Sequence, residues 1–319
     1  MDKKLNLKVI LHSKRANIYY LEKCRVMLKD NRVTYLTSIA DTNNFYNIPI
    51  ANTTVLLLGT GTSITQAAVR YLSSAGVAIG FCGSNGTPLF AGSEIEFINS
   101  KSEYRETKYV QNWLSFWYED SIRLQAAKKF QKNRIDFIKK VWQKDSQIRD
   151  KILYPNEALF DENVSKFSKS IEKAINVNEL LLSEATFTKK LYSICASSLR
   201  IRNFVRDRES LDSINIHLNH GNYLAYGSAS VALWVLGIPP AFALFHGKTR
   251  RGALVFDVAD LIKDAIVLPL AFLSDEDNFN DDSFREKCIE YFSDYSVLDY
   301  MINNIKNVCD DYSIKNREM

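Results

Sequence analysis

The hydrophobic pattern of the chain changes near residue 100, and this change constrains the fold more than any other feature. Before it, apolar residues occur in short runs rich in branched and aromatic side chains, separated by polar turn segments. Such runs are typical of β-strands. After it, large apolar residues recur at three- and four-residue spacing, as at Tyr109, Trp113 and Phe116, which predicts amphipathic helices. We therefore expect an α+β protein, with a β-rich N-terminal domain at 1–100 followed by a larger α-helical domain at 101–319.

The same patterns predict individual elements. Strands are expected near residues 7–12, 16–21, 24–28, 32–36, 55–58 and 77–81. A helix is expected between the last two of these strands, and the later helices at about 162–176, 177–206, 212–236, 254–272 and 283–307. The segment Gly59-Thr-Gly61 precedes the first helix, but Ile64 stands where a dinucleotide-binding loop has its third glycine. We therefore interpret it as a tight turn and not as a nucleotide site.

Cysteine usage and hydropathy bear on the location of the protein. Its five cysteines are scattered, without C-x-x-C spacing, which favours reduced thiols in a cytoplasmic protein over a disulfide framework or a zinc ribbon. The longest apolar run, residues 231–245, is 15 residues long and is broken by Gly237, Pro239 and Pro240. It is too short to span a bilayer, so we expect no membrane association.

Charge is unevenly distributed along the chain. Residues 101–151 contain 13 lysines and arginines against 7 acidic residues, whereas residues 271–319 contain 5 against 12. A basic middle and an acidic tail indicate a surface for a polyanion on one part, and a solvated or partner-facing surface on the other.

The segment from His246 to Asp264 carries the densest chemistry of the chain. Asp257, Asp260 and Asp264 fall at i, i+3 and i+7, so a helix places them on one face, among strongly apolar neighbours. Carboxylates on so apolar a helix are costly to bury unless a cation or dense hydrogen bonding compensates them. Oxygen ligands with one imidazole suit Mg²⁺ or Mn²⁺, and the basic residues of 248–251 suit a phosphate. The pattern therefore indicates a metal-phosphate site, with a solvated acidic helix edge as the alternative.

Three further groups of residues leave alternatives open. Glu184 is a surface residue of a predicted helix unless it is brought to the metal as a third ligand from a distant helix. His217 and His220 stand three residues apart, and structural histidines are favoured there over a second metal pair. Arg200 and Arg202 belong to a basic segment that suits a nucleic-acid backbone, with salt bridges on a helix surface as the alternative.

Longer stretches of the sequence resemble the CRISPR adaptation integrases, the metal-dependent enzymes that insert new spacers into a CRISPR array. These stretches are residues 48–53, 221–227, 234–239, 246–252 and 256–265. They lie in both predicted domains, so the resemblance covers nearly the whole chain, and it looks closest to the subtype I-F branch. The His-x10-Asp-x2-Asp spacing within such extended similarity is far more specific than a short motif.

This resemblance implies roles for particular residues. The metal ligands of the family fall on Glu184, His246 and Asp260, and the metal is then Mg²⁺ or Mn²⁺. Asp257 is the nearby second acid, which orients a ligand or assists proton transfer, so Asp257 and His246 are the candidate catalytic residues. Candidates for holding the DNA backbone are Lys248, Arg250, Arg251, Arg200 and Arg202.

The resemblance also implies an activity and partners. A DNA 3′-hydroxyl would attack a phosphodiester of a repeat strand, and with water as nucleophile the same site would act as an endonuclease. The substrates are double-stranded DNA, both the spacer precursor and the CRISPR repeat. The β-rich domain serves dimerisation and the helical domain catalysis. Two homodimers are expected to flank a small ferredoxin-like adaptation protein, which in this subtype is fused to a helicase-nuclease.

Two other classes of function remain open. A non-catalytic DNA-binding scaffold of a defence complex would bind DNA even when a chelator is present. An unrelated metal-dependent phosphohydrolase would turn over small phosphate esters without marked salt dependence. The 13 basic residues of 101–151 favour a large polyanion over a small ester.

Overall fold

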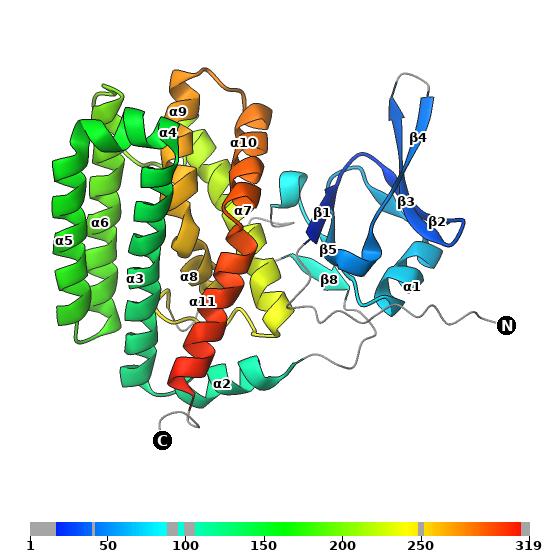
Figure 1. Ribbon diagram of the computed structural model, residues 1–319, viewed down its shortest axis with the longest axis horizontal. Coiled ribbons are helices and arrows are strands. Elements are labelled where there is room, and N and C mark those ends of the chain that lie inside the picture. Colours follow the sequence, from blue (N-terminus) through cyan, green and yellow to red (C-terminus); the bar gives the residue numbers. More distant parts are fainter. Residues whose placement is uncertain (1–16, 40–41, 88–94, 99–105, 248–251, 314–319) are drawn as a thin grey trace.

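The computed structural model of the chain describes residues 17–39, 42–87, 95–98, 106–247 and 252–313. Within these residues the strands end at Ile98 and the main run of helices begins at Lys108. Figure 1 shows a strand-rich lobe beside a larger helical lobe, so the predicted α+β class is confirmed. The strand expected at 7–12 lies outside the described residues.

Two four-stranded sheets build the N-terminal lobe. The first has the order β1-β5-β7-β8, with β1 to β7 parallel and β8 antiparallel. Its strands are β1 (Asn17–Leu21), β5 (Thr53–Leu58), β7 (Ala78–Phe81) and β8 (Glu96–Ile98). The second has the order β4-β3-β2-β6. Its strands are β2 (Arg25–Lys29), β3 (Arg32–Ile39), β4 (Thr42–Asn47) and β6 (Ser63–Ile64). All six residues of β5 are buried, which explains why its last four, Val55 to Leu58, form a continuous apolar run and not an alternating one.

The segment Gly59-Thr-Gly61 is a tight turn between β5 and β6, as predicted. Gly61 has φ +70°, a conformation that side chains disfavour. A Cβ atom on Gly59 would lie 2.2 Å from the hydroxyl oxygen of Tyr20. Backbone conformation and close packing therefore account for both glycines without a bound nucleotide.

In the helical lobe, α8 is a central helix that packs against α3, α7 and α11 (Figure 1). In chain order the α-helices are α1 (Gln66–Ser74), α2 (Lys108–Trp117), α3 (Asp120–Lys144), α4 (Ser146–Ile148), α5 (Glu157–Lys173), α6 (Val177–Ser198), α7 (Ser213–Leu236), α8 (Ala253–Ile262), α9 (Leu268–Glu276), α10 (Asp281–Asp294) and α11 (Val297–Tyr312). The 3₁₀ turns are η2 (Ile50–Asn52), η3 (Ser84–Gly86) and η5 (Tyr154–Asn156), and the π-helical turns are η4 (Arg149–Leu153) and η6 (Lys263–Val267).

Two of the predicted helix boundaries are wrong. The helix expected at 177–206 ends at Ser198, because Arg200 adopts φ +58° and the chain leaves the helix there. The single helix expected at 283–307 is two helices, α10 and α11, separated at Ser296 with φ +48°. In both cases a non-glycine residue takes the left-handed conformation, which the sequence does not signal.

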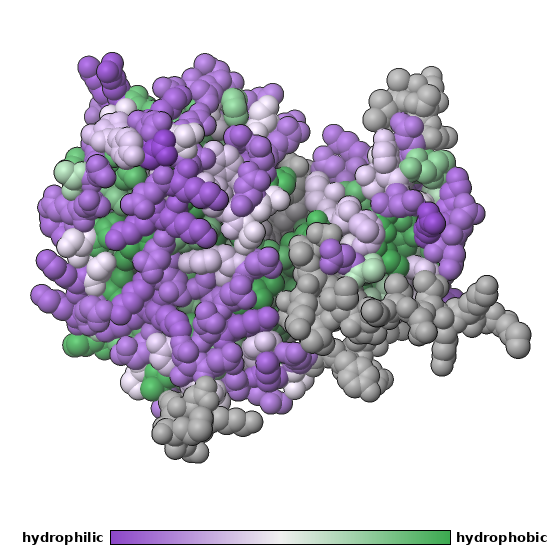
Figure 2. Space-filling view, in the orientation of Figure 1, coloured by the Kyte–Doolittle hydropathy of each residue, from purple (hydrophilic) through white to green (hydrophobic). Residues whose placement is uncertain are grey.

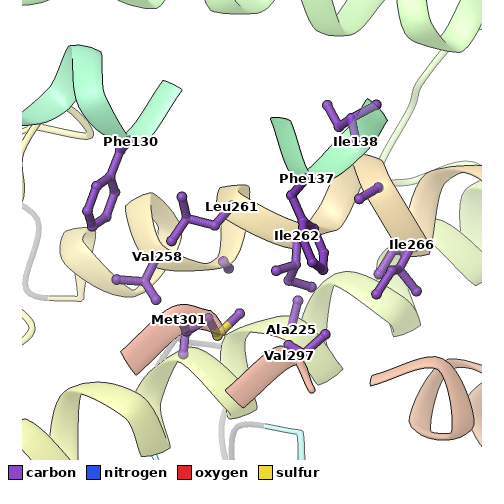
Figure 3. Close-up of a cluster of buried hydrophobic side chains, with 14 of the residues drawn as sticks. Phe130, Phe137, Ile138, Ala225, Val258, Leu261, Ile262, Ile266, Val297 and Met301 are labelled. Carbon is purple, nitrogen blue, oxygen red and sulfur yellow. The ribbon is translucent and has the colours of Figure 1, made fainter. Parts of the chain in front are cut away.

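The apolar face of α8 anchors the centre of the helical lobe. Figure 3 shows Val258, Leu261 and Ile262 packed among side chains from α3, α7 and α11, and those labelled on these three helices are Phe130, Phe137, Ile138, Ala225, Val297 and Met301. These residues are all at most 4% exposed. The five-residue π-helical turn that follows, η6, continues into α9 in the same buried cluster. This packing fixes the backbone that carries the acidic residues of the segment.

The two lobes share part of one hydrophobic core. Val55 and Leu57 of β5 belong to the same buried cluster as the helices, and a second cluster lies on the other side of the sheet, under α1. A Cβ atom on Gly227 of α7 would lie 2.1 Å from the carbonyl oxygen of Gly86, so only glycine permits this close approach. The first sheet therefore packs directly against the helical lobe.

The surface and the cysteines fit the sequence analysis. Figure 2 shows a mainly hydrophilic surface over the helical lobe on the face in view. All five cysteines are buried free thiols. Among the described helices, none combines the length and the apolar character that crossing a membrane requires.

Candidate active site

The three aspartates of the α8 segment are buried in the helical lobe. Asp257, Asp260 and Asp264 are 1%, 4% and 4% exposed, which rules out a solvated helix edge. Asp257 and Asp260 lie on α8, and Asp264 lies in the π-helical turn η6 that continues it. Buried carboxylates need cations or several hydrogen-bond donors, and the three aspartates are satisfied in three different ways.

Asp257 anchors the backbone and the ring of His246. Its Oδ2 accepts from the backbone N–H groups of Leu244 at 2.6 Å and Phe245 at 3.2 Å, and its Oδ1 accepts from that of His246 at 3.1 Å. The Nδ1 atom of His246 lies 2.7 Å from the same Oδ1. Since an ionised carboxylate only accepts, Nδ1 must carry the proton, and the lone pair of the neutral ring is on Nε2.

The Nε2 atom of His246 faces Asp260. It lies 3.7 Å from Oδ2 of Asp260, whose other oxygen is paired with the ammonium of Lys263. Burial lowers the pKa of His246, but the hydrogen bond with Asp257 and the negative charges of Asp260 and Asp257 outweigh it, so the pKa is raised. Burial alone would raise the pKa of Asp260, yet the charges of Lys263, His246 and Arg134 lower it. Asp260 is therefore held as a carboxylate opposite the imidazole.

Arg134 of α3 joins Asp264 to Glu184 of α6. Its Nε donates to Oδ2 of Asp264 at 2.9 Å, and its Nη2 donates to the same oxygen. Its Nη1 donates to Oε1 of Glu184 at 2.7 Å and to Gln131 at 3.2 Å, and Nη2 also donates to Thr188 at 2.8 Å. The positive charge of Arg134 is thus buried between two carboxylates, with its side chain 2% exposed.

The structure brings some of the predicted site residues together and separates others. His246, Asp257 and Asp260 form one group, whereas Glu184 pairs with Arg134, which also pairs with Asp264 of the turn that follows α8. In the part of the chain that the structure describes, no three His, Cys, Asp or Glu side chains are close enough, as placed, to hold a metal. The donors themselves, one imidazole nitrogen and carboxylate oxygens, fit Mg²⁺ or Mn²⁺.

The sequence analysis missed Arg134, Gln131 and Thr188. A signal for Arg134 was present, because it stands at i+4 from Phe130 and three residues before Phe137, inside the apolar stripe of a predicted helix. A charged residue in such a stripe is either buried with a partner or interrupts the stripe. The sequence does not say which acid the partner is.

Two of the five candidate DNA-binding residues lie within the described part of the chain, and three lie outside it. Lys248, Arg250 and Arg251 fall outside the described residues. Arg200 and Arg202 are exposed and lie between α6 and α7, not on a helix. Their assignment to the DNA backbone stays a prediction.

The basic stretch 101–151 directs part of its charge inward. Arg123, Lys128 and Arg134 of α3 are buried, at most 8% exposed. Other basic residues in the stretch pair with acidic residues of distant elements, namely Lys129 with Asp311, Lys132 with Glu172 and Lys151 with Glu276. Much of this charge therefore stabilises the helical lobe, so its net value overstates the surface available to a polyanion.

His217 and His220 of α7 form a separate group with Asp281 of α10. Nε2 of His217 and Nδ1 of His220 lie 3.7 Å and 3.5 Å from Oδ1 of Asp281, and the ring of His217 stacks on Phe284. Burial lowers the pKa of both histidines. This packing supports the structural interpretation of the pair.

Comparison with known proteins identifies close relatives of the chain. The sequence model of the family "CRISPR associated protein Cas1" matches residues 19–294. A CRISPR-associated endonuclease Cas1 from Pseudomonas aeruginosa is 48% identical over 95% of each chain. A second one, from Pectobacterium atrosepticum, is 46% identical over 97% of this chain and 96% of the relative. The crystal structure of a TtCas1–DNA complex has the same fold, with a TM-score of 0.65 and 20% identity over 92% of this chain and 91% of that one.

Proposed function

The chain belongs to the CRISPR-associated Cas1 family, and on this premise we propose that it is a metal-dependent DNA endonuclease and integrase of CRISPR adaptation. Its reaction inserts new spacer DNA into the CRISPR array by attack of a DNA 3′-hydroxyl on a phosphodiester of the repeat. With water as the nucleophile, the same site cleaves DNA. Relatives that share nearly half of its residues are named endonucleases, which supports the nuclease part of the proposal.

The observation that carries the proposal is the arrangement of His246 between two buried aspartates. Asp257 fixes the ring through Nδ1, so that Nε2 is presented to Asp260. An imidazole held in one tautomer by a carboxylate is the usual way in which proteins prepare a metal ligand. Three backbone N–H groups hold the aspartate behind the ring, so the ring is oriented by a carboxylate that is itself fixed.

We assign the metal to Glu184, His246 and Asp260, with Mg²⁺ or Mn²⁺ as the ion. When bound, the ion would polarise the phosphodiester and stabilise the negative charge that develops on it. The chain itself contributes the orientation of the ligands. Asp257 positions His246, and Lys263 lies beside Asp260, where its charge can face the anionic backbone. Lys248, Arg250 and Arg251, which directly follow Gly247, are the candidates for binding DNA phosphates.

The assembly that we propose follows the family. The β-rich domain at 1–100 would mediate a homodimer, and the domain at 101–319 would hold the active site. Two dimers would flank the small ferredoxin-like protein that is fused to the helicase-nuclease in subtype I-F. Spacer precursor and repeat are both double-stranded DNA. The five free thiols are consistent with a cytoplasmic location.

A strand-transfer experiment tests the proposal. The purified protein is incubated with a short duplex bearing 3′-hydroxyls and a supercoiled plasmid carrying a CRISPR array, with Mg²⁺, Mn²⁺ or EDTA. The helicase-fused partner is present in a parallel series. Wild type is compared with Asp260→Asn, which preserves the shape of the side chain, and with Asp299→Asn, an exposed acid of α11 that serves as the control.

We expect nicking or joining that needs the metal and Asp260 and that is unchanged in the control. Cleavage by Asp260→Asn at the wild-type rate would contradict the ligand assignment. DNA binding in EDTA without any strand chemistry, even with the partner added, would favour the non-catalytic scaffold instead.

A further inference from the structure

The guanidinium of Arg134 is saturated with hydrogen bonds. An arginine side chain has five N–H donors in a fixed planar arrangement. All five have an acceptor here, two on Asp264 and one each on Gln131, Glu184 and Thr188. A buried charge that only needed neutralising would be satisfied by one carboxylate, so the arrangement specifies geometry as well as charge.

The acceptors of Arg134 come from three separate elements. Gln131 lies one turn before it on α3, Glu184 and Thr188 lie on α6, and Asp264 lies in η6. The indole Nε1 of Trp142 donates to the backbone carbonyl of Asp264 at 3.2 Å, which ties η6 to α3 a second time. One side chain of α3 thus links α6 to the turn that continues α8.

Only one oxygen of Glu184 takes part in this network. Its Oε1 accepts from Arg134 Nη1 at 2.7 Å and from the hydroxyl of Thr188 at 3.0 Å. Within the residues that the structure describes, Oε2 has no hydrogen-bond partner, and the side chain is 15% exposed. The carboxylate is therefore oriented through one oxygen while the other remains available to a ligand.

We propose that Arg134 is a positioning residue for the metal site: it holds Glu184 by one carboxylate oxygen so that the other can bind the ion beside His246 and Asp260. The proposal rests on the metal assignment made above. In this proposal Arg134 acts through Glu184 and not by binding the metal itself. It orients the ligand Glu184 as Asp257 orients the ligand His246.

Lysine is the informative replacement. Arg134→Lys keeps the buried positive charge between Glu184 and Asp264, but an ammonium has three donors and no fixed plane, so it cannot serve all the acceptors at once. The matched control is Arg123→Lys on the same helix. Arg123 is also buried, but it pairs with Asp120 at 2.8 Å and with the carbonyl of Trp117 at 3.2 Å, both outside the site.

Mn²⁺ affinity without DNA is the primary measurement, made by electron paramagnetic resonance titration. We expect Arg134→Lys to bind Mn²⁺ about 10–100-fold more weakly than wild type, the range typical of residues that orient ligands. The Mn²⁺ concentration for half-maximal cleavage should rise by a similar factor, with a smaller change in the rate at saturating metal. Arg123→Lys should match wild type in both.

A second variant separates positioning from folding. Arg134→Gln combined with Asp264→Asn removes both buried charges of the Arg134–Asp264 pair, so it should fold even if Arg134→Lys does not. We expect its Mn²⁺ affinity to remain weak. Wild-type Mn²⁺ affinity in either folded variant would overturn the positioning role.

Glu184→Gln distinguishes a failure of this inference from a failure of the metal assignment. If it weakens Mn²⁺ binding, and Arg134→Lys adds nothing further in the double variant, Arg134 acts through Glu184 as proposed. If it weakens binding while Arg134→Lys alone does not, the inference is wrong but the metal assignment stands. If Glu184→Gln binds Mn²⁺ like wild type, both are wrong.

Discussion

His246 and Glu184 are held in the site by two different kinds of contact. His246 is oriented by Asp257, 11 residues further along the chain, through its ring and through three consecutive backbone N–H groups. Glu184 is oriented by Arg134, 50 residues earlier on another helix, through one hydrogen bond to one oxygen and a second from Thr188. One side of the site is built locally and the other by tertiary packing.

This difference predicts how each side responds to change. The contacts of His246 lie within a single segment, so they persist as long as α8 and the residues before it keep their shape. The contacts of Glu184 depend on α3, α6 and η6 keeping their positions relative to one another. We therefore expect each single substitution among the contacts of His246 to weaken metal binding strongly. A substitution among the contacts of Glu184 should weaken it less where only a neutral hydrogen bond is lost.

The largest effect is expected from removing the imidazole. His246→Ala should reduce DNA cleavage to the level seen with EDTA, because the metal loses its imidazole ligand and alanine offers no ligand in its place opposite Asp260. Its circular dichroism spectrum should stay that of wild type, since the ring is partly exposed. His220→Ala, which removes a histidine of α7 outside the site, is the control. Metal-dependent cleavage by His246→Ala would contradict the assignment of His246 as a metal ligand.

Asp257→Asn should have the next largest effect. The amide offers one acceptor oxygen where the carboxylate offers two, while three backbone N–H groups and the ring N–H of His246 still point at it. We expect about 10–100-fold weaker Mn²⁺ binding. An orphaned buried donor should also lower the free energy of unfolding by about 1–3 kcal/mol. Calorimetric titration and urea unfolding measure the two, and unchanged Mn²⁺ affinity would show that Asp257 does not orient the ligand.

Thr188→Val should act more weakly, on the packed side. The change removes the hydroxyl that donates to Glu184 at 3.0 Å and accepts from Arg134 at 2.8 Å, but it leaves the charged pair in place. Of the two, the hydrogen bond to Glu184 orients the carboxylate directly, and its loss, about 0.5–1.5 kcal/mol, corresponds to Mn²⁺ affinity about two- to tenfold lower. Thr186→Val on the same helix, where the hydroxyl donates to the Leu182 carbonyl, is the control. An effect as large as that of Asp257→Asn would contradict the smaller role assigned to this neutral hydrogen bond.

The smallest effect is expected on the pH dependence of the free energy of unfolding, where His217 and His246 differ. The pKa of His246 is raised by its aspartates, whereas burial lowers that of His217. His217 therefore binds a proton more readily in the unfolded state than in the folded state. Its contribution to the free energy of unfolding is fully present above the unfolded pKa of about 6.5 and is lost as the pH falls below that value. The free energy of unfolding should therefore drop less between pH 7 and pH 5.5 in His217→Leu than in wild type. Urea unfolding at the two pH values measures this, and equal drops would contradict it.

The same distinction between local and distant contacts explains what the sequence predicts. Strands and helices with regular apolar spacing could be predicted, because the period is a local property. The ends of α6 and α10 could not, since Arg200 and Ser296 take left-handed conformations without a glycine to signal them. The spacing of His246, Asp257 and Asp260 indicates that they share one segment of the site, whereas their roles as ligand and second acid come from the family resemblance. The partner of Glu184 could not be predicted, because nothing near Arg134 in the sequence specifies which helix packs against it.

Anomalous diffraction from crystals grown with Mn²⁺ tests most directly whether Glu184, His246 and Asp260 bind one metal ion. We predict one anomalous peak bonded to Nε2 of His246, to the carboxylate of Asp260 and to Oε2 of Glu184, with Oε1 still hydrogen-bonded to Arg134. A peak at Nδ1 of His246, or one at His217 and His220 with none between Glu184 and Asp260, would contradict the account.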